Sequence, residues 1–394
     1  MEAYLDNAAT TRVFPEVREK MVRVMEEDFG NPSSKHTKGM DAEKYIRETK
    51  EILAKDLKCT PGEIIFTSGG TESNNTALIG GAYANRRAGK HIITTRIEHA
   101  SVHEPLAFLE ELGYQVTYLP VDKNGQVSPS ELEKALTEET ILVSIMFVNN
   151  EIGAVEDVKT LSEIVHSYNP KILFHVDAIQ AYGKYHIVPK RLGIDLMSVS
   201  GHKLHGPKGV GFLYMRDKAK VRPLIYGGGQ QKGFRSGTEN VPGIVGYGKA
   251  AEIAAKTMKE RTAKEIELRD HLIDRILTEI PYVRLNGDRH DRLPNNVNVC
   301  FRYIEGESML ILLDQAGVCA SSGSACTSGS LDPSHVLLAI GLPHEIAHGS
   351  LRLTLSEKNT VEEIDFVVDE LKKIIERLRS MSPLYEDFVK KQSR

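Results

Sequence analysis

The feature that most constrains the fold is an alternation of two patterns between residues 60 and 215. Short runs rich in apolar and β-branched residues are separated by stretches with helical spacing. The runs are EIIFTS (63–68), HIITTR (91–96), YQVTYLP (114–120), ILVSIMFV (141–148), ILFHVD (172–177), DLMSVS (195–200) and GVGFLYM (209–215). Strands that alternate with helices form a largely parallel sheet, and strands that are apolar throughout are covered on both faces. The sequence therefore predicts an α/β fold whose mostly parallel central sheet is flanked by helices.

The segments on either side of this region have patterns of their own. Apolar residues at spacings of three and four predict helices near 16–29 and 40–57. Beyond Gly243 we expect a long helix to about Glu279, and then further elements in the order strand, helix, strand, helix. These elements are NVNVCFRY (296–303), ESMLILLDQA (307–316), SLRLTL (350–355) and a final helix over 361–379. We predict a large domain over 16–245 and a smaller α+β domain made of 1–15 and 246–394.

Charge and composition exclude several classes of protein. Lys and Arg total 50 against 54 Asp and Glu among 394 residues, so no basic excess favours nucleic acid or an anionic membrane. The first residues, MEAYLDNAATTR, lack the apolar stretch of a secretory signal, and the run at 141–148 is far shorter than the ~20 residues that span a bilayer. The 4 cysteines form no CxxC pair, which is typical of reduced thiols. We expect a cytoplasmic protein that binds no nucleic acid, membrane or metal.

Two segments at strand ends indicate ligand binding. In FTSGGTESNN (66–75) a strand ends in glycines and a helix begins, so backbone N–H groups and the Thr71 hydroxyl can bind an anion such as phosphate. Alternatively, Thr71 is only an N-cap and the glycines only turn the chain. Asp177 ends an apolar strand, where ligands bind in open α/β sheets, although an aspartate there is also a common cap.

A third segment combines with these two. Lys203, in SGHKLHGPKGVG (200–211), follows an apolar strand and lies 26 residues after Asp177. A lysine there is either a solvated surface amine or one that forms a Schiff base with an aldehyde. A Schiff-base lysine, a carboxylate for a pyridinium nitrogen and a phosphate site are the attachments that pyridoxal 5'-phosphate requires. Their joint occurrence predicts this cofactor.

The sequence resembles the cysteine desulfurases of the class V aminotransferase group nearly from end to end. The matching motifs are YLDNAATT (4–11), FGNPSS (29–34), GGTESNN (69–75), IEHAS (97–101), NNEIG (149–153), HVDAIQ (175–180), SGHKLHGPKGVG, GGGQ (227–230), RSGTEN (235–240), SSGSACTSG (321–329) and SLRLTLSEKNT (350–360). The resemblance implies a fold type I aminotransferase architecture, a homodimer, bound pyridoxal phosphate, and conversion of L-cysteine to L-alanine.

The resemblance also implies roles for the residues that surround the cofactor ring. Lys203 would form the Schiff base, Asp177 would pair with the ring nitrogen, and His99 would stack over the ring and shuttle protons. Asn150 and Gln180 would lie beside the ring and its hydroxyl. His99 has a plainer alternative, since a histidine in this position can also be a packed core residue.

Further roles concern the phosphate and the substrate. The phosphate ligands implied by the resemblance are Gly70, Thr71, Ser200, His202 and, from a neighbouring subunit, Thr238. Arg352, together with Asn150, would bind the substrate, because a guanidinium can hold a carboxylate by a bidentate ion pair. The plainer alternative for Arg352 is a surface ion pair.

Cys326 separates this sequence from ordinary transaminases. It lies in SSGSACTSGS, whose small polar residues predict a mobile, exposed loop. By the resemblance it receives the substrate sulfur as a persulfide and passes it to an acceptor protein such as an iron–sulfur scaffold. Cys300 and Cys319 are expected in a core, and Cys59 has no distinguishing feature.

Two other functions remain open. A selenocysteine lyase or a related pyridoxal phosphate lyase would share the cofactor site, but the long cysteine loop favours a desulfurase. A non-catalytic sulfur-relay scaffold subunit would need none of the residues Lys203, Asp177, His99 and Cys326. The presence of all four therefore favours an enzyme.

Overall fold

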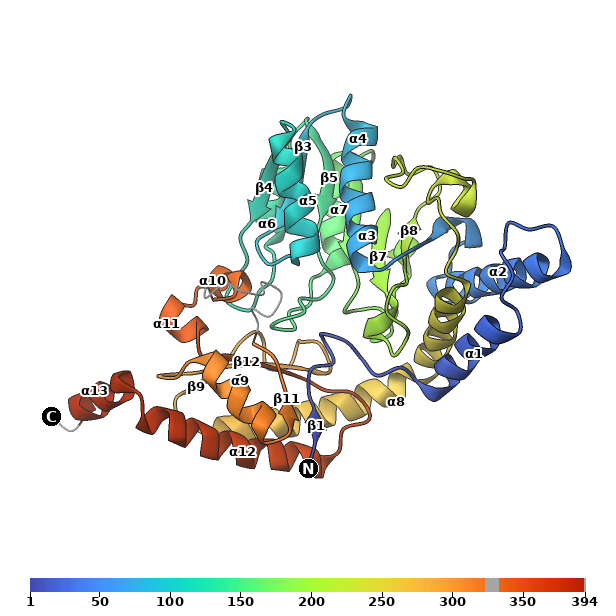
Figure 1. The fold of residues 1–394 in the computed structure, drawn as a ribbon. Coiled ribbons are helices and arrows are strands. Elements are labelled where there is room, and N and C mark those ends of the chain that lie inside the picture. The colour runs from blue at the N-terminus through green and yellow to red at the C-terminus, as the bar shows by residue number, and fades with distance from the viewer. Residues whose placement is uncertain (323–332, 393–394) are drawn as a thin grey trace.

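A computed structural model describes residues 1–322 and 333–392, and its largest element is a seven-stranded sheet (Figure 1). The strands lie in the order β2-β8-β7-β6-β5-β3-β4. Their bounds are β2 Ile64–Thr67, β3 His91–Thr95, β4 Gln115–Leu119, β5 Thr140–Ser144, β6 Leu173–Asp177, β7 Leu196–Ser200 and β8 Gly211–Met215. Strand β8 runs antiparallel to both β2 and β7, and the other four pairings are parallel, so the predicted mostly parallel sheet is confirmed.

The seven strands match the seven predicted runs, with one clear difference in length. Strand β5 ends at Ser144, four residues before the end of the apolar run at 141–148. The backbone N–H groups of Ile145 and Phe147 still donate to carbonyls of β6, at 3.1 and 2.8 Å. The chain therefore stays beside β6 after it leaves the regular strand.

Helices cover both faces of this sheet, which explains why its strands are apolar throughout. Ile92 and Ile93 are consecutive residues of β3, yet they belong to different cores on opposite faces. One face packs against α3 to α5, and the other against α2, α7 and the first half of α8. The bounds are α1 Pro15–Glu26, α2 Thr37–Leu57, α3 Gly70–Asn75, α4 Gly81–Asn85, α5 Ala100–Glu111, α6 Pro129–Ala135, α7 Val158–Tyr168 and α8 Val241–Glu279.

The remaining elements form a smaller α+β unit around a second core. A three-stranded antiparallel sheet has the order β12-β10-β9, and β1 pairs in parallel with β11. The bounds are β1 Ala3–Tyr4, β9 Val283–Leu285, β10 Asn296–Phe301, α9 Gly306–Gln315, β11 Val318–Cys319, α10 His335–Ala339, α11 His344–Ala347, β12 Ser350–Thr354, α12 Val361–Ser380 and α13 Pro383–Gln392. Helix α12 lies alongside α8 (Figure 1).

Helix α8 connects the two units. It has 39 residues; its side chains up to Ala254 belong to the core of the large sheet, and those from Leu268 onwards belong to the core of the small unit. The division that we predict between residues 245 and 246 falls inside this helix. Near the N-terminus, Leu5 packs in the small core and Phe14 in the large one.

Helix α13 is absent from our prediction, which ends the last helix at residue 379. A second helix begins after Ser382 because Pro383 is favourable at a first helical turn but cannot continue α12. Its Tyr385 and Phe388 pack against Tyr303, with ring centroids 5.7 and 4.7 Å from that ring. None of the helices in the described parts of the chain is long and apolar enough to cross a membrane.

Candidate active site

Two predicted site residues, Asp177 and Ser200, lie at the carboxyl ends of the neighbouring strands β6 and β7. Asp177 ends β6 and pairs in register with Ser198 of β7, which ends two residues later at Ser200. One carboxylate oxygen of Asp177 accepts a hydrogen bond from Ile179 N at 3.0 Å, and the other accepts one from Asn74 Nδ2 at 2.8 Å. Burial raises the pKa of Asp177, and these two hydrogen bonds and the nearby His99 and Lys203 oppose that rise.

Lys203 lies in the turn Gly201–Lys203 that follows β7, close to the N-terminal segment of the chain. Its amine donates to the carbonyl oxygens of Ala8 and Ala9, the latter at 2.8 Å. Gln180 Nε2 also donates to the Ala8 carbonyl, at 3.1 Å. The segment that precedes α1 therefore joins Lys203 and Gln180, two of the predicted cofactor residues.

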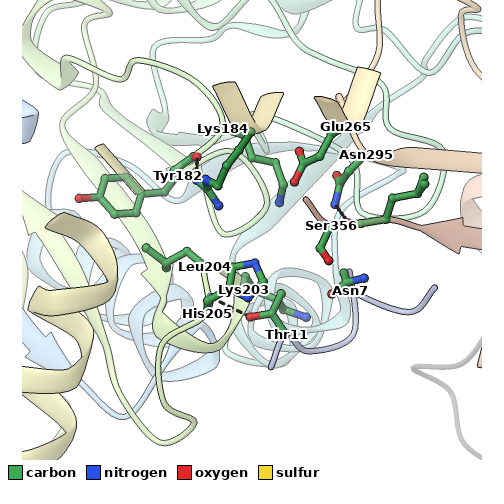
Figure 2. A pocket seen from close by; sticks show the side chains of 13 residues that line it. Asn7, Thr11, Tyr182, Lys184, Lys203, Leu204, His205, Glu265, Asn295 and Ser356 are labelled. Carbon is green, nitrogen blue, oxygen red and sulfur yellow. Dashed lines mark hydrogen bonds between the residues drawn. The ribbon is translucent and has the colours of Figure 1, made fainter. Parts of the chain in front are cut away.

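A small cavity lies on the other side of this turn, where the two units meet (Figure 2). Its lining includes Lys203, Thr11 and the oppositely charged pair Lys184 and Glu265. Desolvation lowers the pKa of Lys184 and raises that of Glu265 to about 7, and each charge opposes the shift of the other. Thr11 Oγ1 accepts a hydrogen bond from the backbone N–H of His205 at 2.7 Å, which fixes the N-terminal segment to the lysine turn.

An open hollow of about 500 Å³ lies beside the start of α3 and contains four of the predicted phosphate ligands. Its lining residues are Ala9, Thr10, Ser68, Gly69, Gly70, Thr71, Glu72, Ser200, His202, Lys208 and Gly209. His202 Nδ1 lies 3.2 Å from Thr10 Oγ1, and burial lowers the pKa of His202 to about 4. The hydroxyl, imidazole and ammonium groups here are donors suited to a phosphate.

Glycines are necessary for the shape of this hollow. A Cβ on Gly211 would lie 2.3 Å from Val199 O and 2.9 Å from Gly69 Cα, both of which are backbone atoms. Gly69 itself has φ 148°, which few other residues adopt. Together with a buried carboxylate at Asp177 and the amine of Lys203, the donor set fits pyridoxal phosphate.

His99 is the N-cap of α5 and is half-buried. Its Nδ1 accepts a hydrogen bond from Ser101 N at 3.0 Å and lies 2.8 Å from Ser101 Oγ. Burial lowers the pKa of His99, and the negative charge of Asp177 opposes this effect. The capping role accounts for the position of the ring at the edge of the sheet.

Arg352 lies on β12 of the small unit and is 3% exposed, so it is not the surface ion pair that was its plainer alternative. It donates to Asp6 Oδ1 at 3.1 Å and to the carbonyl oxygen of Asn150 at 3.3 Å. Its Nε is buried and, among the residues that the structure describes, has no hydrogen-bond partner. Arg352 and Asn150, the two predicted substrate residues, are therefore in direct contact.

The loop that carries Asn150 is fixed to the small unit at several further points. Asn296 and Asn298 both donate to the carbonyl oxygen of Glu151, at 3.0 and 3.1 Å. Arg292 Nη2 donates to the carbonyl oxygen of Ile152 at 3.0 Å. Small-unit side chains thus bind three consecutive carbonyl groups, 150 to 152, which holds Asn150 in place relative to Arg352.

Other predicted residues lie apart from this group or outside the described residues. Thr238 is exposed on the loop before α8, and it is not among the residues that line the hollow. Cys326 lies outside the described residues. Cys300 is buried as predicted, whereas Cys319 is only half-buried because it ends a two-residue strand that, within residues 1–322 and 333–392, pairs only with β1. Burial raises the pKa of both Cys59 and Cys300 to about 11.

Several contacts at the candidate site are absent from the sequence-based prediction. Asn74 and Ser101 lie within the motifs GGTESNN and IEHAS, but neither residue receives a role of its own there. The backbone carbonyls of Ala8 and Ala9 carry no side-chain signal at all. Only the motif YLDNAATT, with its small residues at 8 and 9, indicates that the backbone is approached closely.

Comparisons with known proteins agree with this geometry. The model of the aminotransferase class V family matches residues 3–367. A protein named cysteine desulfurase IscS from Clostridium botulinum (strain Hall) is 52% identical over 99% of this chain and 98% of its own length. The cysteine desulfurase IscS of Methanosarcina thermophila is 53% identical over 97% of this chain and 94% of its own.

A solved structure described as a NifS-like protein superposes with a TM-score of 0.91 at 40% identity, covering 96% of this chain and 100% of the other. A second, a NifS-like protein from Rickettsia africae, has a TM-score of 0.86 at 32% identity, covering 95% of this chain and 100% of the other. These neighbours confirm the fold type I architecture. With a family match over most of its length, this chain belongs to the class V aminotransferase family of pyridoxal phosphate enzymes.

Proposed function

We propose that this chain converts L-cysteine to L-alanine and receives the sulfur on Cys326 as a persulfide, for delivery to an acceptor protein such as an iron–sulfur scaffold. One observation carries the proposal. The Lys203 amine, the buried Asp177 carboxylate and the hollow beside the start of α3 lie together at the ends of β6 and β7, in a chain 52% identical to a protein named cysteine desulfurase.

The residues of the site divide the work of holding the cofactor. Gly70, Thr71, Ser200 and His202 would hold its phosphate, Gln180 would lie beside its ring, and Asp177 would face its ring nitrogen. When bound, pyridoxal phosphate supplies an aldehyde for amines and a ring that withdraws electrons from the substrate Cα. The hydrogen bonds from Ile179 N and Asn74 to Asp177 stabilise the charged carboxylate, which such a partner needs.

Lys203 acts as a base in this proposal. The carbonyls of Ala8 and Ala9 accept hydrogen bonds from its amine and fix its position after β7. Carbonyl oxygens accept hydrogen bonds from an ammonium group but do not take its proton. The amine of Lys203 can therefore take up the Cα proton of the substrate and keep the same hydrogen-bond partners.

Arg352 and Asn150 orient the substrate. The unpartnered, buried Nε of Arg352 is a donor available to the substrate carboxylate, while Asp6 and the Asn150 carbonyl hold the other two guanidinium nitrogens. A guanidinium held on two sides loses little further conformational freedom on binding, which favours tight orientation of the substrate.

The sulfur step belongs to Cys326. Its thiolate attacks the substrate sulfur, a sulfur–sulfur bond forms and the carbon–sulfur bond breaks. The electron pair of the broken bond stays with the substrate carbon, which takes up a proton to give the methyl group of alanine. His99 is the nearby group that exchanges protons with the substrate.

Homodimerisation and a cytoplasmic location are also part of this proposal. Tyr226 and Phe29 are 74% and 69% exposed, large apolar surfaces that a second copy can cover, and the exposed Thr238 would reach a phosphate in that copy. Sedimentation of the purified protein would test this, since an active, cofactor-loaded monomer contradicts the shared site.

The decisive experiment follows the sulfur. After a single turnover with L-cysteine, peptide mass spectrometry should find one added sulfur on Cys326 and none on Cys59, Cys300 or Cys319. The Cys326→Ser variant should retain cofactor and bind cysteine but transfer no sulfur, whereas Cys319→Ser, the matched control at the half-buried thiol, should transfer it normally.

Two results would replace the proposal. If Cys326→Ser released alanine and sulfide at an undiminished rate, the enzyme would be a lyase that needs no thiol of its own, as in the selenocysteine lyase alternative. If the unmodified protein bound no pyridoxal phosphate even after reconstitution, the relay scaffold would be favoured.

A further inference from the structure

The chemistry of the donor groups around His99 determines the direction of each hydrogen bond to its ring. Nδ1 of His99 accepts from the backbone N–H of Ser101 at 3.0 Å, and a backbone N–H can only donate. Nδ1 must therefore present its lone pair and carry no proton. In the neutral ring the proton is then on Nε2.

A second chain of hydrogen bonds leads to the same result. Asn74 Nδ2 lies 2.8 Å from Asp177 Oδ2 and 2.9 Å from Ser101 Oγ. A carboxylate accepts only, so the amide nitrogen of Asn74 must face it and donates one hydrogen to each neighbour. The Ser101 hydroxyl, which accepts from Asn74, has one hydrogen of its own, and His99 Nδ1 lies 2.8 Å away to accept it.

The network is well protected from water. Asn74, Ser101 and Asp177 are 0%, 7% and 5% exposed. Exchange with solvent hydrogen bonds is therefore restricted, and reversing one bond would require reversing the next or leaving a buried donor unpaired, which is costly.

From this arrangement we infer that Ser101 and Asn74 are positioning residues, which fix His99 as the neutral tautomer with its proton on Nε2 and link that tautomer to the Asp177 carboxylate. Nε2 then begins a turnover with a hydrogen to present, and it has no lone pair with which to accept the Cα proton. The consequence for catalysis rests on the proposed function: Lys203 alone removes the Cα proton, and His99 donates a hydrogen bond from Nε2 to the substrate.

Charging His99 would disturb the network on every side. A proton on Nδ1 would face the N–H and hydroxyl hydrogens of Ser101, and it would break the cap of α5. The ionisable groups that act on His99 are Asp177, which favours the charged ring, and Lys203, His335, Arg352 and His103, which oppose it. The balance of these charges and of burial lowers the pKa of His99, in agreement with the donor directions.

The tautomer can be observed directly by ¹⁵N NMR of the full-length protein labelled in its histidines. The His99 signals among the 14 histidines are identified as those missing from His99→Gln. We expect an unprotonated Nδ1 and a protonated Nε2 at neutral pH, both without cofactor and after it is added. A proton on Nδ1, or signals averaged over both tautomers, would overturn the inference.

Variants test the roles of the two positioning residues. Ser101→Ala removes one of the two donors to Nδ1, so His99 should titrate at higher pH than in the parent. Ser101→Thr keeps the hydroxyl and should restore the parent titration. The matched control is Ser162→Ala, which removes a buried hydroxyl that donates to Leu192 O at 2.6 Å and not to a histidine. This variant should leave the His99 titration unchanged.

Asn74→Ala should also shift the His99 titration, and this shift should be smaller in a Ser101→Ala background, because Asn74 acts on His99 through the serine hydroxyl as well as through Asp177. Equal shifts in both backgrounds, or an unchanged titration in Ser101→Ala, would contradict the network. Since these spectra need neither substrate nor turnover, the tautomer can be established even in a protein that fails to desulfurate cysteine, and the two conclusions can fail separately.

Discussion

His175 provides a sharp test of how the sheet tolerates polar groups beneath the site. It lies on β6, two residues before Asp177, and its side chain is completely buried. Its ring nitrogens lie 2.8 Å from Ser144 Oγ on β5 and 3.0 Å from Ser198 Oγ on β7. Both neighbours are neutral hydroxyl groups, so the ring gains hydrogen bonds but no compensating negative charge, and burial lowers its pKa from 6.5 to about 3.

The size and sign of the effect follow from proton linkage. Between pH 6.5 and 3 the unfolded chain binds a proton at His175 that the folded chain does not, so stability is present above pH 6.5 and is lost as the pH falls towards 3. At about 1.4 kcal/mol per pH unit, the full range corresponds to about 5 kcal/mol. By pH 5 the loss should reach about 2 kcal/mol.

The assay compares unfolding free energies at pH 8 and pH 5, measured with urea at equal protein concentration and without added cofactor. His175→Gln keeps an amide that can bond both serines but does not titrate in this range. Between pH 8 and pH 5 the free energy of unfolding of this variant should fall by about 2 kcal/mol less than that of the parent, whatever the stability of the variant at pH 8. His344→Gln removes an exposed histidine and is the control. Equal losses in His175→Gln and the parent would refute the argument that this ring is buried neutral.

Three further predictions concern the site itself. Lys203→Ala should lose both the visible absorption of bound cofactor and the formation of alanine, as measured by spectroscopy and amino-acid analysis, and a variant that kept both would disprove its assignment. Arg352→Lys should raise the KM for cysteine by about tenfold or more without changing cofactor absorption, because an ammonium cannot hold a carboxylate in the same bidentate way. Gly211→Ala should lower the free energy of unfolding by about 1 to 3 kcal/mol, because its Cβ would lie 2.3 Å from Val199 O. Gly229→Ala, where a Cβ would meet nothing within 4 Å, should be nearly neutral in the same urea titration.

The parts of this fold that could be predicted are those whose structure is determined by residues close to one another in the sequence. Strands β5, β6 and β7 are apolar throughout because both faces are covered, and that pattern is visible in the sequence. Asp177 ends one such strand and Lys203 lies three residues after another, so their location at the carboxyl edge of the sheet was predictable from the same pattern.

What could not be predicted depends on contacts between distant segments. The bonds from Lys203 to Ala8 and Ala9 join residues 195 and 194 positions apart, and they involve backbone atoms. The partial exposure of Cys319 follows from the position of β11, which among the described residues pairs only with β1, and no local pattern reveals that pairing. The bridging role of Asn74 is equally hidden, because its partners Ser101 and Asp177 are 27 and 103 residues away.

The pairing of β1 with β11 has a consequence for the order of events during synthesis of the chain. Ala3, made among the first residues, pairs with Val318, and the adjoining Ala8 and Ala9 then hold Lys203. At the usual ribosomal rates of about 5 to 20 residues per second, the N-terminal segment waits roughly 15 to 60 s for its partner strand to emerge. The central sheet can form in that interval, so the lysine turn should be completed last. Extra residues fused before Met1 would travel with this late-docking strand and should delay the acquisition of cofactor more than residues fused after Arg394.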